Sequence, residues 1–152
     1  MIRTLKRMVS NVEETKAVAG EIFEMLKSEG NFTVFLEGDL GAGKTFLIRE
    51  VLKKFGITDE VTSPTFIIFN EYFSEKFNRR FAHFDFYRLE EEGEFFNRGL
   101  ADIADDLDVS SFVEWPEKIS AKACEAFSGK KFLIKIERTE KKGEREIEFC
   151  EQ

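Results

Sequence analysis

Apolar residues recur at two periods along this chain, and the change of period separates predicted helices from predicted strands. Residues 10–30 predict an amphipathic helix, because their apolar side chains share one helical face: Val12, Ala19, Ile22, Phe23 and Leu26. Ser10, with Glu13 three residues later, has the spacing of a capping box, and Gly30 marks the predicted end.

A second helical pattern follows a glycine-rich loop. The run "FTVFLE" (32–37) is too short for a helix and apolar on both sides, which is typical of a central parallel strand. After the loop, apolar residues return at a spacing of about 3.6 residues: Leu47, Ile48, Val51, Leu52 and Phe55. Gly56 supplies the predicted helix end. The order is therefore strand, glycine loop, helix.

The rest of the chain favours strands in pairs. "TFIIFNEYF" (65–73) and "RFAHFDFY" (80–87) predict one hairpin, and "KKFLIKIE" (130–137) with "REIEFC" (145–150) predict another that turns at Gly143. "SSFVEW" (110–115) reads as a short strand, and residues 89–108 as one or two short helices. These elements predict an α/β, three-layer fold like that of P-loop NTPases, with a mixed, mainly parallel central sheet and antiparallel hairpins.

Composition narrows the class of protein. The 152 residues predict a single domain over 1–152, and 42% apolar with 35% charged residues indicates a folded globular chain. The net charge of −7 argues against direct binding to DNA or RNA, so a role on nucleic acid would run through another protein. The 18 phenylalanines predict a phenylalanine-built core.

No targeting or membrane signal accompanies this composition. No stretch approaches the about 18 uninterrupted apolar residues of a membrane span. Cys124 and Cys150 lack the spacing of a zinc or redox site, and free thiols fit a reducing compartment. We therefore expect a cytoplasmic protein.

The glycine loop carries the most specific chemistry. Its spacing, Gly38-x-x-x-x-Gly43-Lys44-Thr45, is that of a phosphate-binding loop, and a chance match is expected about once in two hundred chains of this length. Glycines let backbone amides turn toward phosphate oxygens, and the following helix points its positive end there. The predicted nucleotide-binding residues are consecutive: Gly38, Asp39, Leu40, Gly41, Ala42, Gly43, Lys44, Thr45 and Phe46.

Such a site also needs a carboxylate near Mg²⁺. Asp85 lies on the polar side of an alternating strand, and Glu114 ends a short strand. The alternatives are an edge-strand acid facing water for Asp85 and a turn acid for Glu114. Ser63 and Thr65 place hydroxyls in a loop that is either an ordinary turn or a loop that senses the γ-phosphate. The single histidine, His83, is expected to be structural rather than a general base.

Four motifs in order resemble the TsaE family, formerly YjeE, the bacterial ATPases that assist synthesis of N6-threonylcarbamoyladenosine in tRNA. The motifs are "LEGDLGAGKT", "VTSPTFIIFNEY", "HFDFYRL" and "FVEWPEKI". Together they span about residues 34–119. The segment after Arg88 departs from the family's usual acid-rich helix followed by Leu-Gly. Partner contacts in that segment are therefore not carried over.

The resemblance implies binding of ATP or ADP with Mg²⁺, slow hydrolysis, and work with TsaD-like and TsaB-like proteins, with tRNA reached only through that complex. Lys44 becomes the catalytic phosphate lysine and Thr45 a metal ligand. Asp85 and Glu114 become catalytic or metal-linked carboxylates, and which of them binds the metal directly is left open. Ser63, Thr65 and Trp115 join the nucleotide-binding residues.

Three other functions were weighed. A small kinase would carry an arginine-bearing lid, and no segment resembles one. A GTPase would carry Asn-Lys-x-Asp, which is absent. A nucleotide-gated interaction module, in which ATP fixes a docking conformation and hydrolysis is incidental, stays open. The sequence shows no obvious positioned base and no clear arginine finger, for which Arg88 is the one candidate, so we expect weak hydrolysis by the isolated chain.

Overall fold

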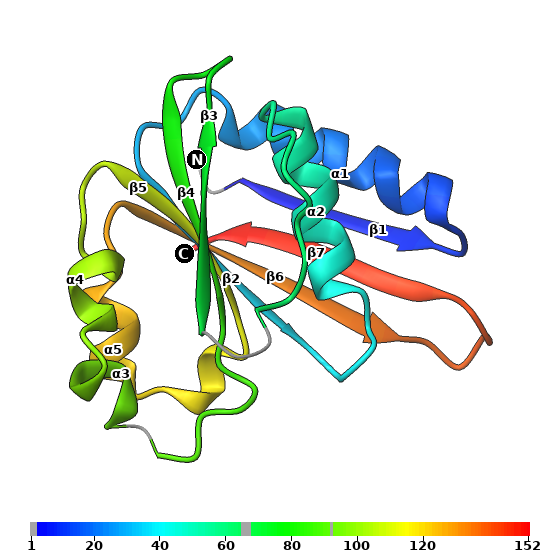
Figure 1. Cartoon of the computed structure of the whole chain (residues 1–152). Helices are drawn as coiled ribbons and strands as arrows, with labels where there is room; N and C mark the ends of the chain where they lie inside the picture. Colours follow the sequence, from blue (N-terminus) through cyan, green and yellow to red (C-terminus); the bar gives the residue numbers. More distant parts are fainter. Residues whose placement is uncertain (1–2, 65–67, 92) are drawn as a thin grey trace.

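Seven strands form one sheet in which the four central strands run parallel (Figure 1). The computed structural model describes residues 3–64, 68–91 and 93–152. The strand order is β1-β7-β6-β2-β5-β4-β3. The parallel strands are β2 (Phe32–Gly38), β4 (Arg79–Asp85), β5 (Val109–Glu114) and β6 (Lys130–Arg138). The antiparallel ones are β1 (Thr4–Val9), β3 (Phe69–Ser74) and β7 (Arg145–Glu151).

Helices cover both faces of the sheet, which gives three layers (Figure 1). One face carries α1 (Val12–Leu26) and α2 (Lys44–Lys54). The other carries α3 (Glu94–Asn97), α4 (Leu100–Ala104) and α5 (Ala121–Ala126), and a short 3₁₀ turn, η1 (Pro116–Lys118), follows β5. The predicted fold class is confirmed, including both hairpins.

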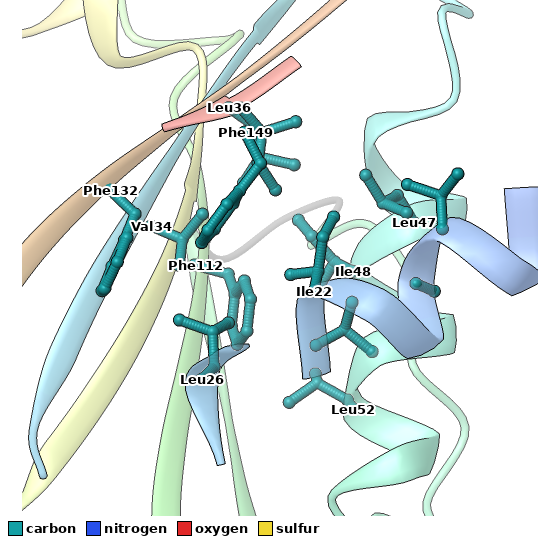
Figure 2. Close-up of a cluster of buried hydrophobic side chains, with 14 of the residues drawn as sticks. Ile22, Leu26, Val34, Leu36, Leu47, Ile48, Leu52, Phe112, Phe132 and Phe149 are labelled. Atoms are coloured by element: carbon teal, nitrogen blue, oxygen red, sulfur yellow. The ribbon is translucent and has the colours of Figure 1, made fainter. Parts of the chain in front are cut away.

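Phenylalanine dominates the packing on each side of the sheet. Under α1 and α2, Phe32 contacts Phe112 edge-to-face at 5.8 Å between ring centroids, and the rings of Phe132 and Phe149 stack at 5.1 Å. Figure 2 shows Ile22 of α1 facing this aromatic layer. On the other face, Phe127 is surrounded by further phenylalanine rings. The expected phenylalanine core is therefore present.

Helix ends were predicted with mixed success. Asn11, not Ser10, caps α1, because its side chain accepts a hydrogen bond from the amide of Glu14. The Glu14 carboxylate in turn accepts a hydrogen bond from the amide of Ser10 at 2.6 Å. The whole box is therefore one residue later than the sequence pattern placed it. Val12, predicted on the apolar face, is 54% exposed, and Val18 is buried on that face instead. Gly56, with φ +85°, follows α2 as predicted.

Three local expectations were wrong or incomplete. Gly30 does not end α1, which stops at Leu26 with Lys27 as its cap. Strand β1 had no clear apolar alternation, because it is an edge strand whose residues are mostly exposed. Helix α5 is one short segment capped by Ser120, and the sequence pattern missed it. One or two short helices were expected between residues 89 and 108, and two are present, α3 and α4.

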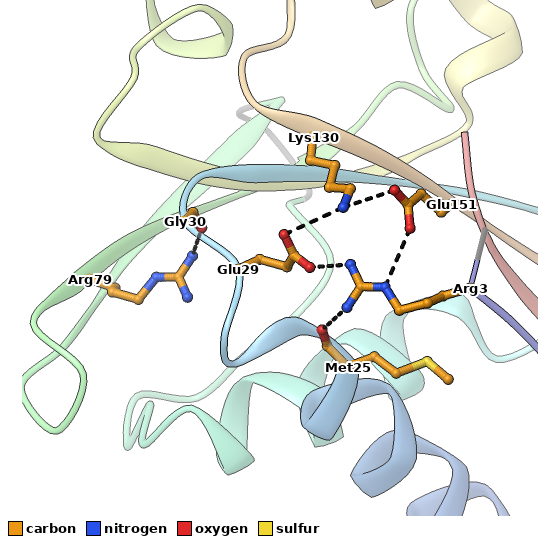
Figure 3. A network of polar contacts seen from close by, with 7 residues as sticks. All are labelled: Arg3, Met25, Glu29, Gly30, Arg79, Lys130 and Glu151. Atoms are coloured by element: carbon orange, nitrogen blue, oxygen red, sulfur yellow. Dashed lines mark hydrogen bonds and ion pairs between the residues drawn. The ribbon is translucent and has the colours of Figure 1, made fainter. Parts of the chain in front are cut away.

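A polar network joins both ends of the chain at the sheet edge opposite the glycine loop (Figure 3). Arg3 binds the Glu29 carboxylate, the Met25 carbonyl at 3.0 Å and Glu151 at 3.3 Å, and Lys130 binds Glu151 at 2.8 Å. These contacts fix β1 and β7 beside the end of α1. In the part of the chain that the structure describes, no helix is both long and apolar enough to span a membrane.

Candidate nucleotide-binding site

The carboxyl ends of the parallel strands bring the predicted site residues to one edge of the sheet. β2 ends at Gly38, β5 at Glu114 and β4 at Asp85. Glu114 pairs in register with Leu36 on one side and with Asp85 on the other. In α/β sheets, ligands bind at this edge, where connections leave in opposite directions. The glycine loop crosses this edge between β2 and α2.

The glycine loop uses its three glycines for two different reasons. Gly41 and Gly43 have φ of +76° and +109°, conformations that side chains oppose. Gly38 has no positive φ; instead, a Cβ there would lie 2.8 Å from the carbonyl oxygen of Ile136 on β6. Among the hydrogen bonds of the described residues, none occupies the amides of Gly41, Gly43, Lys44 or Thr45. Those amides, at the start of α2, can therefore receive an anion.

Lys44 lies beneath this loop rather than in solvent. Its side chain is buried, its Nζ donates to the Gly38 carbonyl, and Nζ lies 3.5 Å from the centroid of the Trp115 ring. Burial lowers the pKa of the Lys44 ammonium, while the nearby Glu114 charge acts in the opposite direction. The groups that contact the ammonium, a carbonyl oxygen and an aromatic ring, carry no net charge, so a phosphate with its full negative charges can displace them.

Thr45, Glu114 and His83 form a connected chain of side chains. The Thr45 hydroxyl lies 3.0 and 2.9 Å from the two Glu114 carboxylate oxygens. His83 Nε2 lies 2.6 Å from Glu114 Oε2, and both residues are buried. The hydroxyl and the carboxylate, predicted separately, are thus in direct contact. His83 was expected to be structural, and its contact with Glu114 places it behind the site.

Asp85 lies next to Glu114 but is bound to other groups. Its Oδ2 accepts the Ser63 hydroxyl at 2.6 Å, and its Oδ1 accepts the Tyr87 amide at 3.0 Å. Ser63 therefore lies beside Asp85 at this edge of the sheet, and its role toward a nucleotide stays a prediction. Thr65 lies outside the described residues. Both Asp85 oxygens already accept protein donors, so Asp85 acts here as an anchor for the two loops that contain Ser63 and Tyr87.

Trp115 has an unusual backbone conformation for a bulky residue. Its φ is +59°, and it connects β5 to η1 while its ring contacts that of Tyr87 at 4.9 Å between centroids. A non-glycine residue in this region costs about 1–3 kcal/mol and persists where its surroundings enforce it. Together with the glycine loop, Trp115 and Tyr87 line a cavity of about 610 Å³ that also contacts Arg88 and Arg98.

Two arginines of the closing hairpin were missed by the sequence analysis. Arg138 donates to the Leu40 carbonyl at 3.3 Å and Arg145 to the Gly41 carbonyl at 3.4 Å. They are register partners on β6 and β7. Each lies far along the chain from the loop residue that it contacts, by 98 residues for Arg138 and 104 for Arg145. A hairpin pattern contains no signal for that contact. Arg145 also lines a second cavity, of about 290 Å³, with Val12 and Phe46.

The available metal ligands are oxygens. In residues 3–64, 68–91 and 93–152, no group of three His, Cys, Asp or Glu side chains is arranged to hold a metal ion. The Thr45 hydroxyl and the Glu114 carboxylate, in mutual contact, fit Mg²⁺, which takes few protein oxygens and keeps several waters. Asp85, bound to Ser63, lies in the adjacent register position.

Comparisons with known proteins agree with this geometry. The sequence model of the family described as "Threonylcarbamoyl adenosine biosynthesis protein TsaE" matches residues 9–147. A relative from Rickettsia felis, named tRNA threonylcarbamoyladenosine biosynthesis protein TsaE, is 37% identical over 74% of this chain and 63% of its own length. A relative of the same name from Bacillus subtilis is 42% identical over 61% of this chain and 56% of its own length. The chain thus spans less than two thirds of these relatives.

The fold has a solved counterpart. The crystal structure of YdiB from Bacillus subtilis superposes with a TM-score of 0.68 at 31% identity, covering 99% of this chain and 87% of that one. The match extends over the sheet, the glycine loop and the helices on both faces. The family model, the curated relatives and the fold all agree, and the chain belongs to the TsaE family.

Proposed function

We propose that residues 1–152 form a single P-loop ATPase domain that binds ATP or ADP with Mg²⁺, hydrolyses ATP weakly, and supports synthesis of threonylcarbamoyladenosine in tRNA. Its relatives carry the name of that pathway. The observation that carries the proposal is the convergence of Lys44, Thr45 and Glu114 on the glycine loop.

The triphosphate would lie along the unoccupied amides of Gly41, Gly43, Lys44 and Thr45. Phosphate oxygens would accept hydrogen bonds from these amides. Lys44 would leave the Gly38 carbonyl and the Trp115 ring and bind the β- and γ-phosphates instead. Thr45 and Glu114 would hold Mg²⁺, which neutralises charge on the phosphate oxygens when bound. In this arrangement Ser63 and Asp85 lie at the γ-phosphate end of the cavity.

The nucleoside would lie on the opposite side of the loop. The second cavity shares Ala42, Gly43 and Phe46 with the first one, so the two cavities lie against the same loop. Its walls combine apolar side chains with the polar groups of Asn11 and Arg145. Such a mixture suits a flat base with hydrogen-bonding edges.

Weak hydrolysis follows from the groups around the cavity. Asp85, the first-choice catalytic or metal-linked carboxylate, has both oxygens bound to protein donors. Arg98 forms an ion pair with Glu94 at 2.9 Å. Arg88 lines the cavity, but its position there does not assign it to the γ-phosphate. A site with a phosphate cradle but no poised base binds nucleotide well and turns it over slowly.

The biological setting follows from charge and family. An acidic chain with net charge −7 gains little from counterion release on tRNA, so TsaD-like and TsaB-like proteins would hold the tRNA in the cytoplasm. ATP hydrolysis would support repeated turnover of that complex rather than the transfer chemistry itself.

Calorimetric titration with ATP, with and without Mg²⁺, tests the binding step. Lys44→Ala should weaken ATP affinity about 100-fold, because it removes a charge-assisted contact from a desolvated site worth about 1.5–3 kcal/mol. Lys54→Ala, on the same helix but exposed, is the matched control and should bind within about twofold of wild type. Unchanged affinity in Lys44→Ala would refute the assignment.

The pathway role needs a second assay. Threonylcarbamoyl transfer to tRNA is measured over many turnovers with TsaD-like and TsaB-like proteins, beside ATPase rates of this chain alone and in the complex. Wild type should sustain turnover and Lys44→Ala should stop after the first cycle. Fast ATP hydrolysis by the isolated chain, at the rate of a dedicated kinase, would contradict the weak-ATPase proposal.

The nucleotide-gated interaction module is favoured by one observation. Asp85 links the loop of Ser63 to the loop of Tyr87, and Tyr87 is 43% exposed, so this carboxylate couples the nucleotide cavity to the surface. Asp85→Ala separates the two functions. If hydrolysis is needed, the variant binds nucleotide and partners but fails to support modification; if ATP acts only by fixing a docking conformation through this link, the variant still binds nucleotide but loses the ATP-dependent binding of partners.

A further inference from the structure

The deepest polar contact of the site joins two strands beneath the glycine loop. His83 on β4 is fully buried, and its Nε2 lies 2.6 Å from Oε2 of Glu114, which is 3% exposed. No nucleotide atom could reach His83, because Glu114 and Thr45 lie between it and the cavity that Glu114 lines. His83 therefore acts on a ligand only through Glu114.

Strand register explains why a histidine reaches this carboxylate. Asp85 pairs directly with Glu114, and His83 pairs with Phe112, so His83 and Glu114 are diagonal neighbours on the face that packs under α2. Diagonal side chains on neighbouring strands are about 7–8 Å apart at the backbone, a gap that two long side chains can close.

The hydrogen-bond pattern assigns the proton on the imidazole. Nδ1 of His83 is buried and has no partner among the described residues. A proton on Nδ1 would be a buried donor with no acceptor, whereas a proton on Nε2 is donated to Glu114. The neutral imidazole with hydrogen on Nε2 is therefore the form that fits, and it leaves only an acceptor unused.

This contact restricts how the carboxylate can turn. Oε2 accepts from His83 on one side, while both oxygens face the Thr45 hydroxyl at 3.0 and 2.9 Å on the other. Without His83, the buried carboxylate would be free to rotate toward the ammonium of Lys44, whose charge already interacts with it. Rotation would take the carboxylate away from Thr45.

We propose that His83 is a positioning residue that holds the Glu114 carboxylate against the Thr45 hydroxyl and thereby sets the Mg²⁺-dependent part of nucleotide affinity. The inference rests on the proposed function of the site. Partners that orient a metal-binding group typically change metal affinity about 10–100-fold when removed. His83 itself contacts neither the nucleotide nor the metal.

Two conservative substitutions distinguish this role from simple packing. Glutamine places its amide nitrogen near the position of the histidine Nε2, so His83→Gln keeps the donor to Glu114. Asparagine is shorter and reproduces only the position of Nδ1, so His83→Asn loses that donor while remaining polar. Both variants remove the ring, and asparagine leaves the larger void, so the role of His83 is read from the Mg²⁺-dependent gain in affinity and not from stability.

Titrations with ADP, with and without Mg²⁺, give the readout. Without Mg²⁺, all three proteins should bind ADP alike; with Mg²⁺, the gain in affinity should fall about tenfold in His83→Asn and stay within about threefold of wild type in His83→Gln. On a Glu114→Gln background, His83→Asn should change nothing further. The same Mg²⁺ gain in His83→Asn as in wild type would overturn the proposal.

A measurement on the unaltered protein avoids any loss of folding. His83 is the only histidine in the sequence, so its imidazole nitrogens are assigned directly in a ¹H–¹⁵N NMR spectrum. We expect hydrogen on Nε2 in slow exchange with water, and protonation on Nδ1 alone would overturn the proposal. If wild type binds no nucleotide at all, the proposed function fails; if it binds and the variants show no Mg²⁺ difference, only the role of His83 fails.

Discussion

Gly38→Ala tests whether the backbone of β6 leaves no room for a side chain at residue 38, where the glycine loop begins. The added Cβ would lie 2.8 Å from the Ile136 carbonyl oxygen and 3.3 Å from the Ala42 Cβ, shorter than the 3.4 Å at which ordinary van der Waals contact starts. Gly38 and Ile136 are register partners, so the clash is relieved only by moving two hydrogen-bonded strands apart.

The expected cost follows from this geometry. Overpacking against a backbone that cannot yield costs about 1–3 kcal/mol of unfolding free energy. For a chain of this size, each kcal/mol corresponds to about 2–4 °C in melting temperature. We therefore expect Gly38→Ala to unfold at a lower urea concentration and lower temperature than wild type, with the same dependence on urea.

Gly20→Ala is the matched control, because Gly20 lies inside α1 with no atom within 4 Å of a built Cβ. Replacing a helical glycine by alanine adds about 0.5–1 kcal/mol of stability. The two identical substitutions should therefore shift the urea midpoint in opposite directions. A Gly38→Ala variant as stable as wild type, within about 0.5 kcal/mol, would refute the steric account of Gly38.

Three further predictions concern the site, the core and the ends of the chain. Mg²⁺–ATP should change the fluorescence of Trp115, the single tryptophan, because Lys44 leaves its ring; calorimetric binding without a spectral change would contradict this. Phe127→Ala should lose about 3–5 kcal/mol in urea unfolding, against about 0.5 kcal/mol or less for the half-exposed Phe73→Ala, since Phe127 is 1% exposed among other rings. The hydrogen bond from Lys130, and then Arg3, lowers the pKa of Glu151 below its ordinary 4.5, so its stabilisation is present above pH 4.5 and lost as pH falls through the lowered value; Glu151→Gln should melt lower than wild type at pH 7, and the difference should vanish in acid. A difference that persists in acid would contradict the ion-pair account.

Local sequence patterns predicted most of the helices and strands, and the predictions failed for those with a weak apolar pattern. The 3.6-residue repeat of α2, its end before Gly56 and the glycine loop that precedes it each depend on residues close together in the sequence. Edge strand β1 is mostly exposed and shows no alternation, so it was missed. The capping box was misplaced by one residue because Ser10 and Asn11 are both good caps.

The sequence by itself determined the glycine loop, the order of the strands and helices apart from β1 and α5, and the family. Only the tertiary structure decided which side chains meet. Glu114 contacts Thr45, 69 residues away, and His83 contacts Glu114, because parallel pairing of β2, β5 and β4 aligns their ends. Arg138 and Arg145 reach the loop across the closing hairpin. Such contacts depend on register between distant strands, which local periodicity does not encode.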